Sequence, residues 1–494
     1  MTPTRSRPSP QHQPRRVVVL GASLAGALAA AAAATAAPGR TVTLLERDEL
    51  PGTPLPRSGV PQGRQPHVFL LRGLLAVEEL LPGFRDDLRA AGAVEIDTGD
   101  LAWNSELGWQ PTGRPQFALL SATRPLFEDV VRRRVAGLPG VEVRDGVRVE
   151  GLRRGGPGEP AWWVDLADGT GVAADLVVDA TGRSSRLPVW LDALGVSPAR
   201  VTDIDARVGY ASRLYALAPG RVAPTGVVVQ QSPGEPRGGL ALPVEGGRWV
   251  VAGVGSGAQR PPRDDNGFVA HLRGLRDGAL AEIHDAGVPE GEVAVHRQTG
   301  NRRHHYEDVR DWPAGLLVTG DALCAFNPVY GHGVTVAACE ALVLRDALRR
   351  GLRPGRERRV LRRLAREAAV PWAIATGEDL RFPTSEGSPP AVSALLGRWT
   401  RQVGLLAVHG DELAHRTTSA VYHLMGPPRL LLRPGLVAAA VRARLRGFGP
   451  ATERPVVVRP VVLRPVVLRP GADGAPTGGG HDAGRAADAS PAGR

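Results

Sequence analysis

A glycine-rich turn lies between an apolar strand and a helix-forming segment near the start of the chain. Residues 17–20 (VVVL) are a short apolar run, and the turn GASLAG at 21–26 follows them directly. Such a turn lets the backbone approach a pyrophosphate at a helix N-terminus. A second apolar run at 41–45 ends on Glu46, where a βαβ unit carries the acid that binds a ribose. These residues predict a dinucleotide site.

A second loop of the same kind occurs late in the chain. Gly320 and Asp321 end an apolar run at 316–319, and Gly331-His332-Gly333 opens a long helical segment. The carboxylate could bind a ribityl hydroxyl, and the backbone N–H groups at a helix start could stabilise an electron-rich ring that gains charge. Ala180-Thr181-Gly182 ends another buried strand and offers a further close backbone approach, while Arg124 could reach a phosphate.

The first segment also allows a different interpretation. Arg15 and Arg16 precede about twenty apolar residues that end in small side chains, which is typical of a twin-arginine export signal. A cleaved signal gives no reason for the strand at 41–45 and its terminal Glu46. We therefore favour the strand, turn and helix interpretation.

Composition limits the class of protein. At 494 residues the chain predicts two or three structural units, and its only cysteines are Cys324 and Cys339, so we expect a cytoplasmic protein without a disulfide framework. No apolar run outside the alanine-rich helix is long enough for a membrane span.

The net charge of +11 is concentrated in one stretch. Residues 345–366 carry ten arginines and two acids, without an aromatic residue, so we expect a solvated helical face rather than a nucleic-acid site. Anionic lipid or an acidic carrier protein could contact this face. All basic residues of the chain are arginines.

The pattern of elements predicts an α/β fold. We expect a Rossmann-like dinucleotide-binding domain, an inserted mainly antiparallel β-sheet substrate domain, and C-terminal helices. The repeat RPVVVRPVVLRPVVLRP at 454–470 has proline at every fifth position, which forbids a helix or a central strand. The predicted boundaries are 1–14 disordered arm, 15–190 first part of the dinucleotide-binding domain, 191–300 β domain, 301–350 second part of the dinucleotide-binding domain, 351–448 helical region and 449–494 disordered tail.

From residue 16 to about 445 the chain resembles the FAD-dependent monooxygenases of the para-hydroxybenzoate hydroxylase fold. It is most similar to bacterial FAD-dependent epoxidases and hydroxylases of polyether and polyketide biosynthesis. The long segment LLVTGDALCAFNPVYGHGVTVAACEAL is the most specific part of the resemblance. Other segments that carry it are VVVLGASLAG, LLERD, GVPQGRQPHVFLLRG, DLVVDATGRSSRLPVWL, RRHHYE and PWAIATGEDLRFP.

The resemblance implies an FAD site assembled from several loops. The first turn would cradle the pyrophosphate, Glu46 would bind the adenosine ribose and Arg124 would support the phosphates. Asp321 would bind the ribityl chain, with the loop 331–333 beside the isoalloxazine. The full set of expected cofactor-binding residues is Gly21, Ser23, Leu24, Ala25, Gly26, Glu46, Arg47, Arg64, Arg124, Thr181, Gly182, Gly320, Asp321, Pro328, Gly331, His332, Gly333 and Val334.

The chain departs from the family pattern at three places. Thr181 stands where many relatives carry an aspartate linked to FAD and NAD(P)H handling, so electrons could come from NADPH or NADH directly or through a separate flavin reductase. His332 stands where close relatives usually carry glutamine, and Gln65-Pro66 where they more often carry His-Ala. We expect His332 to pack beside the flavin rather than to donate a proton.

The resemblance implies chemistry that belongs to the flavin. Reduced FAD would react with O2 to give a C4a-hydroperoxide, and one oxygen atom would pass to an alkene or an electron-rich ring of a small-molecule secondary metabolite such as a polyketide. Tyr210, Arg213 and Tyr215 are candidates for the substrate cavity. The adjacent His304 and His305 are not expected to bind a metal.

Two other flavin reactions occur on folds of this kind. Halogenases of the same fold use a lysine and a Trp-x-Trp-x-Ile-Pro segment, and this chain has neither. A flavin-dependent reductase or dehydrogenase of an isoprenoid or polyketide double bond remains the alternative.

Overall fold

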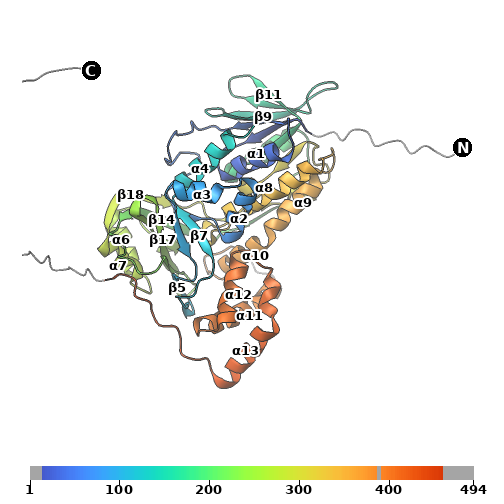
Figure 1. The fold of residues 1–494 in the computed structure, drawn as a ribbon. Helices are drawn as coiled ribbons and strands as arrows, with labels where there is room; N and C mark the ends of the chain where they lie inside the picture. The colour runs from blue at the N-terminus through green and yellow to red at the C-terminus, as the bar shows by residue number, and fades with distance from the viewer. Residues whose placement is uncertain (1–13, 387–390, 460–494) are drawn as a thin grey trace, which may run out of the picture. The chain divides into compact units, whose positions relative to one another are not determined.

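A computed structural model describes residues 14–386 and 391–459 (Figure 1). Five parallel strands form the first sheet, in the order β20-β12-β1-β2-β8. The strands β20, β12, β1 and β2 are mostly apolar and buried, as expected for parallel strands that are covered on both faces, whereas the edge strand β8 has exposed Glu142 and Arg144. Their bounds are β1 Arg16–Leu20, β2 Thr41–Leu45, β8 Val141–Arg144, β12 Leu176–Asp179 and β20 Leu316–Val318.

Two long helices pack beside this sheet. Helix α1 (Leu24–Ala36) connects β1 to β2 and lies against α8 (Gly333–Arg349). Nearly every residue of α1 is buried, because its alanines let neighbouring elements approach on all sides. The structure thus confirms the strand, turn and helix interpretation of residues 17–36, and the export-signal interpretation does not fit them.

Further elements complete this part of the fold. The sheet β9-β10-β11 lies at the top of Figure 1, and its Trp162 is fully buried. Strands β13, β19 and β21 form another small sheet. The bounds of the helices and strands in this part are α2 Leu71–Leu80, α3 Phe84–Ala90, α4 Arg124–Ala136, α5 Leu187–Ala193, β9 Val149–Arg154, β10 Trp162–Leu166, β11 Gly171–Ala174, β13 Val201–Ile204, β19 Asn301–His304 and β21 Cys324–Ala325.

A seven-stranded sheet forms the second layer, in the order β18-β14-β17-β16-β15-β5-β6. Helices α6 (Asp265–Arg273) and α7 (Ala279–Ala286) cover one of its faces. The bounds are β5 Leu101–Ser105, β6 Gly108–Trp109, β14 Val208–Ala216, β15 Gly226–Val229, β16 Arg237–Val244, β17 Arg248–Ser256 and β18 Val288–His296. A small sheet, β3-β7-β4, adjoins it with β3 His67–Val68, β4 Val94–Asp97 and β7 Ala118–Ala122.

The predicted domain boundary between residues 190 and 191 does not separate the two sheets. Strands β5 and β6 come from the segment assigned to the dinucleotide-binding domain, yet β5 pairs in parallel with β15. The pairing partner lies more than a hundred residues further along the chain, so local pattern gives no sign of it.

Helices dominate the C-terminal part. They are α9 Glu357–Glu367, α10 Ala369–Asp379, α11 Ala391–Val408, α12 Glu412–Tyr422 and α13 Pro434–Arg446. Helices α11, α12 and α13 lie together at the bottom of Figure 1 and share a small apolar core that includes Val403, Ala414 and Leu436. Among the described residues, no helix is long and apolar enough to cross a membrane.

The predicted disordered tail is wrong for its described part, residues 449–459. Val457 is buried in the core of the β domain, Val458 forms a β-bridge with Val222, and Arg454 pairs with Asp277 and Glu282. Proline excludes regular ladder pairing, but it does not prevent a single bridge or the burial of a valine between prolines. The rest of the predicted tail, 460–494, and residues 1–13 of the predicted arm lie outside the described residues.

Candidate functional site

A cavity of about 570 Å³ lies where the two predicted loops meet. A Cβ atom built on Gly320 would lie only 2.6 Å from the Cβ of Ala25, so the loop after β20 touches the start of α1. The structure therefore confirms that these two distant loops come together. The predicted site residues that line the cavity are Ser23, Leu24, Ala25, Arg47, Arg124, Thr181, Gly182, Tyr210, Gly320, Asp321, Pro328, Gly331, Gly333 and Val334.

The turn after β1 is so tightly packed that only glycine fits at its two ends. Gly21 has a φ of +90°, and a Cβ there would lie 2.8 Å from the carbonyl oxygen of Ala180. A Cβ on Gly26 would lie 1.7 Å from the carbonyl oxygen of Gly21. The residues after β12 thus pack closely against the turn. Gly21 and Gly26 do not line the cavity, but they allow the close packing that forms its wall.

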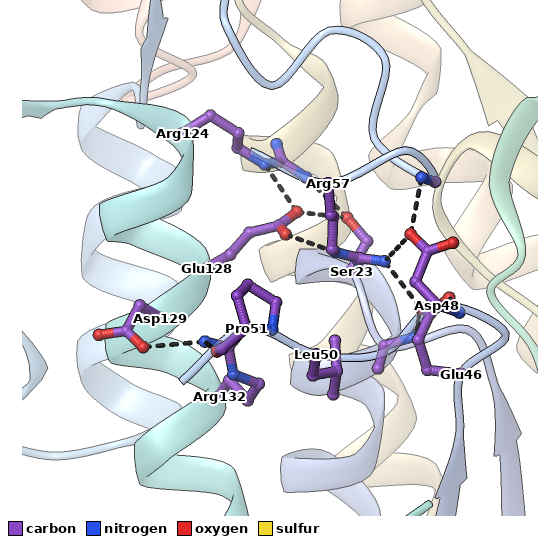
Figure 2. Close-up of polar contacts among 12 residues, drawn as sticks. Ser23, Glu46, Asp48, Leu50, Pro51, Arg57, Arg124, Glu128, Asp129 and Arg132 are labelled. Carbon is purple, nitrogen blue, oxygen red and sulfur yellow. Dashed lines mark hydrogen bonds and ion pairs between the residues drawn. The ribbon is translucent and has the colours of Figure 1, made fainter. Parts of the chain in front are cut away.

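Ser23 binds a buried carboxylate next to the turn (Figure 2). Its Oγ donates a hydrogen bond to Glu128 Oε1 at 2.7 Å, and Arg124 Nη2 donates to the same Oγ at 2.8 Å. Arg124 Nε also donates to Glu128 at 3.0 Å. Burial would raise the pKa of Glu128, but Arg124 and Arg57 outweigh it, so the pKa is lowered and the group stays ionised.

Arg57 joins this cluster to the end of β2 (Figure 2). It pairs with Glu46, Asp48 and Glu128 at 3.1, 3.1 and 3.2 Å, and its Nη2 has no hydrogen-bond partner among the described residues. Glu46 does not line the cavity directly. Its carboxylate accepts a 2.8 Å hydrogen bond from the backbone N–H of Ala22 and so holds the glycine turn in place.

Sequence reasoning missed Arg57 and Glu128. Glu128 follows Arg124 by four residues on a helix, and that spacing brings the two side chains together, so this pair was accessible to prediction. Arg57 lies in a Pro/Gly-rich connector without periodicity, so nothing local indicated that its side chain would be buried.

Asp321 and the backbone at Gly331 in the second loop line the cavity. Asp321 pairs with Arg183 at 3.3 Å, and Arg183 also donates to the carbonyl oxygens of Gly300 and Phe326. Gly331 and Gly182 have φ values of +67° and +79°, and no described atom lies within 4 Å of a Cβ built on either. Backbone at both positions is therefore open to a ligand in the cavity.

A buried aspartate at the end of α10 anchors the loop 327–330. Asp379 accepts hydrogen bonds from Tyr330 OH at 2.7 Å, from Asn301 Nδ2 at 2.6 Å and from Asn327 Nδ2 at 3.0 Å. Tyr210 OH donates to Asn327 Oδ1 at 3.2 Å, which ties β14 to the same network. Burial raises the pKa of Asp379 to about 6 in spite of these donors.

His332 lies beneath the cavity rather than in its wall. It is fully buried and packs against Tyr422, with 5.4 Å between the ring centroids. Burial lowers the pKa of His332 to about 4, so the imidazole is neutral at pH 7. This geometry fits a packing role.

Of the three predicted substrate residues, only Tyr210 faces the cavity. The prediction is wrong for Arg213 and Tyr215, which lie on the other face of β14. Arg213 binds Gly291 O and Asp265, and Tyr215 is buried with its OH against His284 of α7. Side chains alternate across a strand, and sequence alone left open which face was covered by helices.

Arg64 also differs from its predicted role. Its side chain is exposed and does not line the cavity, and only its carbonyl oxygen contributes, by accepting from Ser212 Oγ. The neighbouring Gln65 and Pro66 line the cavity instead.

The β domain supplies an apolar and uncharged wall. Its strands contribute side chains that include Leu101, Trp103 and Leu242. Gln231 also lines this wall and is buried, and neither of its amide atoms has a hydrogen-bond partner within the described part of the chain. A buried amide of this kind is costly unless a ligand or water binds it. No periodic pattern around Gln231 indicated this position.

One cluster outside the cavity brings three candidate metal ligands together. Atoms of His305, Glu307 and Asp308 lie within 4.8 Å of one another. Glu307 already pairs with Arg303 at 2.7 Å, and Asp308 with Arg200 at 3.7 Å. Because these arginines neutralise the acids, we assign no cation to the cluster.

Comparisons with known proteins agree with this architecture. No protein family model matches the chain. A flavoprotein/dehydrogenase from Cytophaga hutchinsonii is similar with a TM-score of 0.61 at 15% identity, over 87% of this chain and 98% of that one. A triple mutant of the flavin-dependent brominase Bmp2 gives 0.59 at 16%, over 87% and 97%. PqsL, a probable FAD-dependent monooxygenase from Pseudomonas aeruginosa, gives 0.54 at 17%, over 74% and 93%.

The fold is therefore that of the FAD-dependent monooxygenases of the para-hydroxybenzoate hydroxylase type. In sequence, the chain is 33% identical over 417 residues to Protein Rv3254 of Mycobacterium tuberculosis (strain ATCC 25618 / H37Rv), which covers 79% of this chain and 84% of that protein. The chain belongs to the same family as Protein Rv3254.

Proposed function

We propose that this protein is an FAD-dependent monooxygenase that inserts one oxygen atom from O2 into a small apolar molecule. The reaction would be epoxidation of an alkene or hydroxylation of an electron-rich ring, and a polyketide or related secondary metabolite is the expected substrate class. The observation that carries the proposal is the meeting of the Gly21 turn and the Asp321 loop at one cavity.

The residues at this cavity fit FAD. The pyrophosphate would lie at the start of α1, near Ser23 and Arg124, where free backbone N–H groups and a guanidinium favour negative charge. Arg47 lines the cavity beside the proposed adenosine ribose, and Asp321 lines it beside the proposed ribityl chain. The Glu46 carboxylate, which does not line the cavity, holds the glycine turn next to them. The open backbone at Gly331 and at Gly182 is consistent with a ligand there.

Bound FAD would supply the redox and oxygen chemistry. The chain would position the ring and keep water away. Asp379 holds the loop 327–330 against β19, and Arg183 fixes the orientation of Asp321. Both are positioning residues, since their side chains act on other protein groups.

The substrate side of the cavity favours a neutral molecule. The described residues of the β domain contribute apolar side chains, glutamines, Tyr210 and His296 to the lining, but no aspartate, glutamate or arginine. Gln231 could then bind one polar group of an otherwise apolar substrate, because its amide atoms are free of described partners.

The electron source in this proposal is NADPH or NADH, used directly or through a separate reductase. We propose that the enzyme works in the cytoplasm, where these reductants are present. Thr181 is the residue that bears on this choice. Its Oγ1 donates to Asp179 Oδ1 at 2.6 Å, so the hydroxyl is already engaged by the protein. A flavin reductase partner would account for a cavity with no acid at this position.

Flavin retention tests the proposal directly. Purified protein is expected to be yellow and to release FAD on denaturation, and Asp321→Ala is expected to lose most of its flavin. Asp203→Ala serves as the matched control, since Asp203 also pairs with an arginine but lies outside the cavity. A colourless wild-type protein that takes up no added FAD would refute the assignment.

Product analysis distinguishes oxygenation from the alternative. A monooxygenase consumes O2 and its product gains one oxygen atom, whereas a flavin-dependent reductase of a double bond gives a product with two additional hydrogens and needs no O2. Halogenation is disfavoured because the chain contains no lysine to carry an activated halogen.

A further inference from the structure

Helix α13 presents two different apolar faces. Leu436, Ala440 and Ala443 are buried in the core that α13 shares with α11 and α12. Val437, Val441 and Leu445 are exposed, with 42%, 54% and 79% of their surface accessible. A surface helix of a globular protein normally has one apolar face, which packs on the core. The second face of α13 therefore needs a different explanation.

The exposed residues form one continuous stripe. They recur every fourth residue, which aligns side chains on a helix of about 3.6 residues per turn. Leu432 is also exposed, at 58%, but it belongs to the 3₁₀ segment Pro428–Leu432 that precedes α13. We call these three side chains of α13, Val437, Val441 and Leu445, the α13 stripe.

Basic side chains lie on both sides of the α13 stripe. Residues 413–452 contain no aspartate or glutamate. At about 3.6 residues per turn, Arg444 falls on one side of the stripe and Arg442 on the other. The exposed arginines of this region are Arg429, Arg433, Arg442, Arg444 and Arg446.

We propose that the α13 stripe and its arginines bind the surface of an anionic lipid bilayer. An apolar stripe between basic side chains is the pattern of a helix that lies in the membrane interface, with its apolar residues among the acyl chains and its arginines at the headgroups. The same face of a second copy of this protein is a poorer partner. The arginines of the two copies would repel each other, and residues 413–452 contain no acid to compensate.

The arginine-rich helix α9 lacks one half of this pattern. Its outward arginines include Arg359, Arg362 and Arg366, but its apolar residues Val360 and Leu361 are buried against the rest of the fold. Helix α9 can attract anions, whereas it has no apolar group to insert. The two helices therefore form a natural comparison.

The cavity is close to the α13 stripe along the chain. Tyr422 and His423, at the end of α12, line the cavity, and the short 3₁₀ segment Pro428–Leu432 connects this point to α13. A bilayer at α13 would bring a lipid-soluble substrate near the cavity. Lipid binding itself does not depend on the proposed oxygenase function.

Co-sedimentation with vesicles tests the inference. The full chain is expected to sediment with vesicles of phosphatidylglycerol and phosphatidylcholine, and not with phosphatidylcholine alone. Val437→Ser, Val441→Ser and Leu445→Ser combined should lower the partition coefficient by on the order of tenfold or more. Arg442→Gln, Arg444→Gln and Arg446→Gln combined should give a similar loss and remove most of the salt dependence.

Two control variants separate this surface from general basicity. Arg359→Gln, Arg362→Gln and Arg366→Gln combined remove the same charge from α9, and Val189→Ser with Val288→Ser removes exposed valines elsewhere. Both should bind as the wild type does, with melting temperatures of all variants unchanged. The inference is overturned if the anionic vesicles bind no protein, if the α9 variant loses binding instead, or if light scattering finds a dimer that the α13 serine variant dissociates.

Discussion

Gly26 and Gly377 are both glycines inside helices, but they meet very different surroundings. A Cβ on Gly26 would lie 1.7 Å from the carbonyl oxygen of Gly21, whereas no described atom lies within 4 Å of a Cβ on Gly377. One glycine is required by a close approach of backbone, and the other is only tolerated. The difference determines what each substitution should do.

Gly26→Ala is expected to destabilise the protein by about 3 kcal/mol and to lower its flavin content, because the methyl group must displace the turn. Gly377→Ala is expected to be neutral or to stabilise by about 0.5–1 kcal/mol, since alanine favours a helix. Urea unfolding and flavin absorbance measure both effects. Equal stability of the two variants would show that the turn is not tightly packed.

At the scale of elements, Asp379 joins three parts of the chain. It receives hydrogen bonds from Asn301 of β19 and from Asn327 and Tyr330 of the cavity loop, while it belongs to α10 itself. Both of its carboxylate oxygens act as acceptors. An asparagine at this position would replace one of these oxygens with an NH2 group, and that donor would face another donor instead of accepting its hydrogen bond.

Asp379→Asn is expected to cost about 1–3 kcal/mol of stability, the usual penalty for a buried donor that loses its acceptor. The loop 327–330 should also loosen, so FAD should dissociate faster. Asp311→Asn is the control, since Asp311 accepts hydrogen bonds from Ser197 at an exposed site away from the cavity. Unchanged flavin dissociation in Asp379→Asn would mean that the network does not position the loop.

The response of the whole molecule to pH should depend on Glu340. This side chain is fully buried in α8, and its Oε2 accepts hydrogen bonds from Thr319 Oγ1 and from the backbone N–H of Gly320, both at 2.7 Å. Burial raises the pKa of Glu340 from its ordinary 4.5 to about 8. As pH rises, the folded protein therefore keeps the proton on Glu340 at pH values where the unfolded chain has already released it.

For such a group, stability is fully present below the ordinary pKa and is lost as pH rises toward the folded-state value. Glu340→Gln cannot ionise, so the variant should gain stability relative to the wild type between about pH 6 and about pH 8. Urea unfolding at both pH values measures this difference. A constant difference between the two proteins would mean that Glu340 is ionised in the folded state.

Local pattern determined a large part of this protein. The strand and glycine turn at 17–26, Glu46 at the end of β2 and the loop around Asp321 were all predicted from residues close together in the chain. Their types follow from short-range demands on backbone, such as the close approach at Gly21 and Gly26. Those demands are the same wherever the segment lies in the molecule, so they can be recognised in sequence.

Tertiary structure alone decided which residues meet across long distances. It placed β5 beside β15, buried Val457 against the β domain, and turned Tyr210 but not Arg213 toward the cavity. It also gathered Arg57, Glu128 and Ser23 from three separate segments. Strand pairing and facing depend on which surface is covered by other elements, and no single stretch of sequence contains that information.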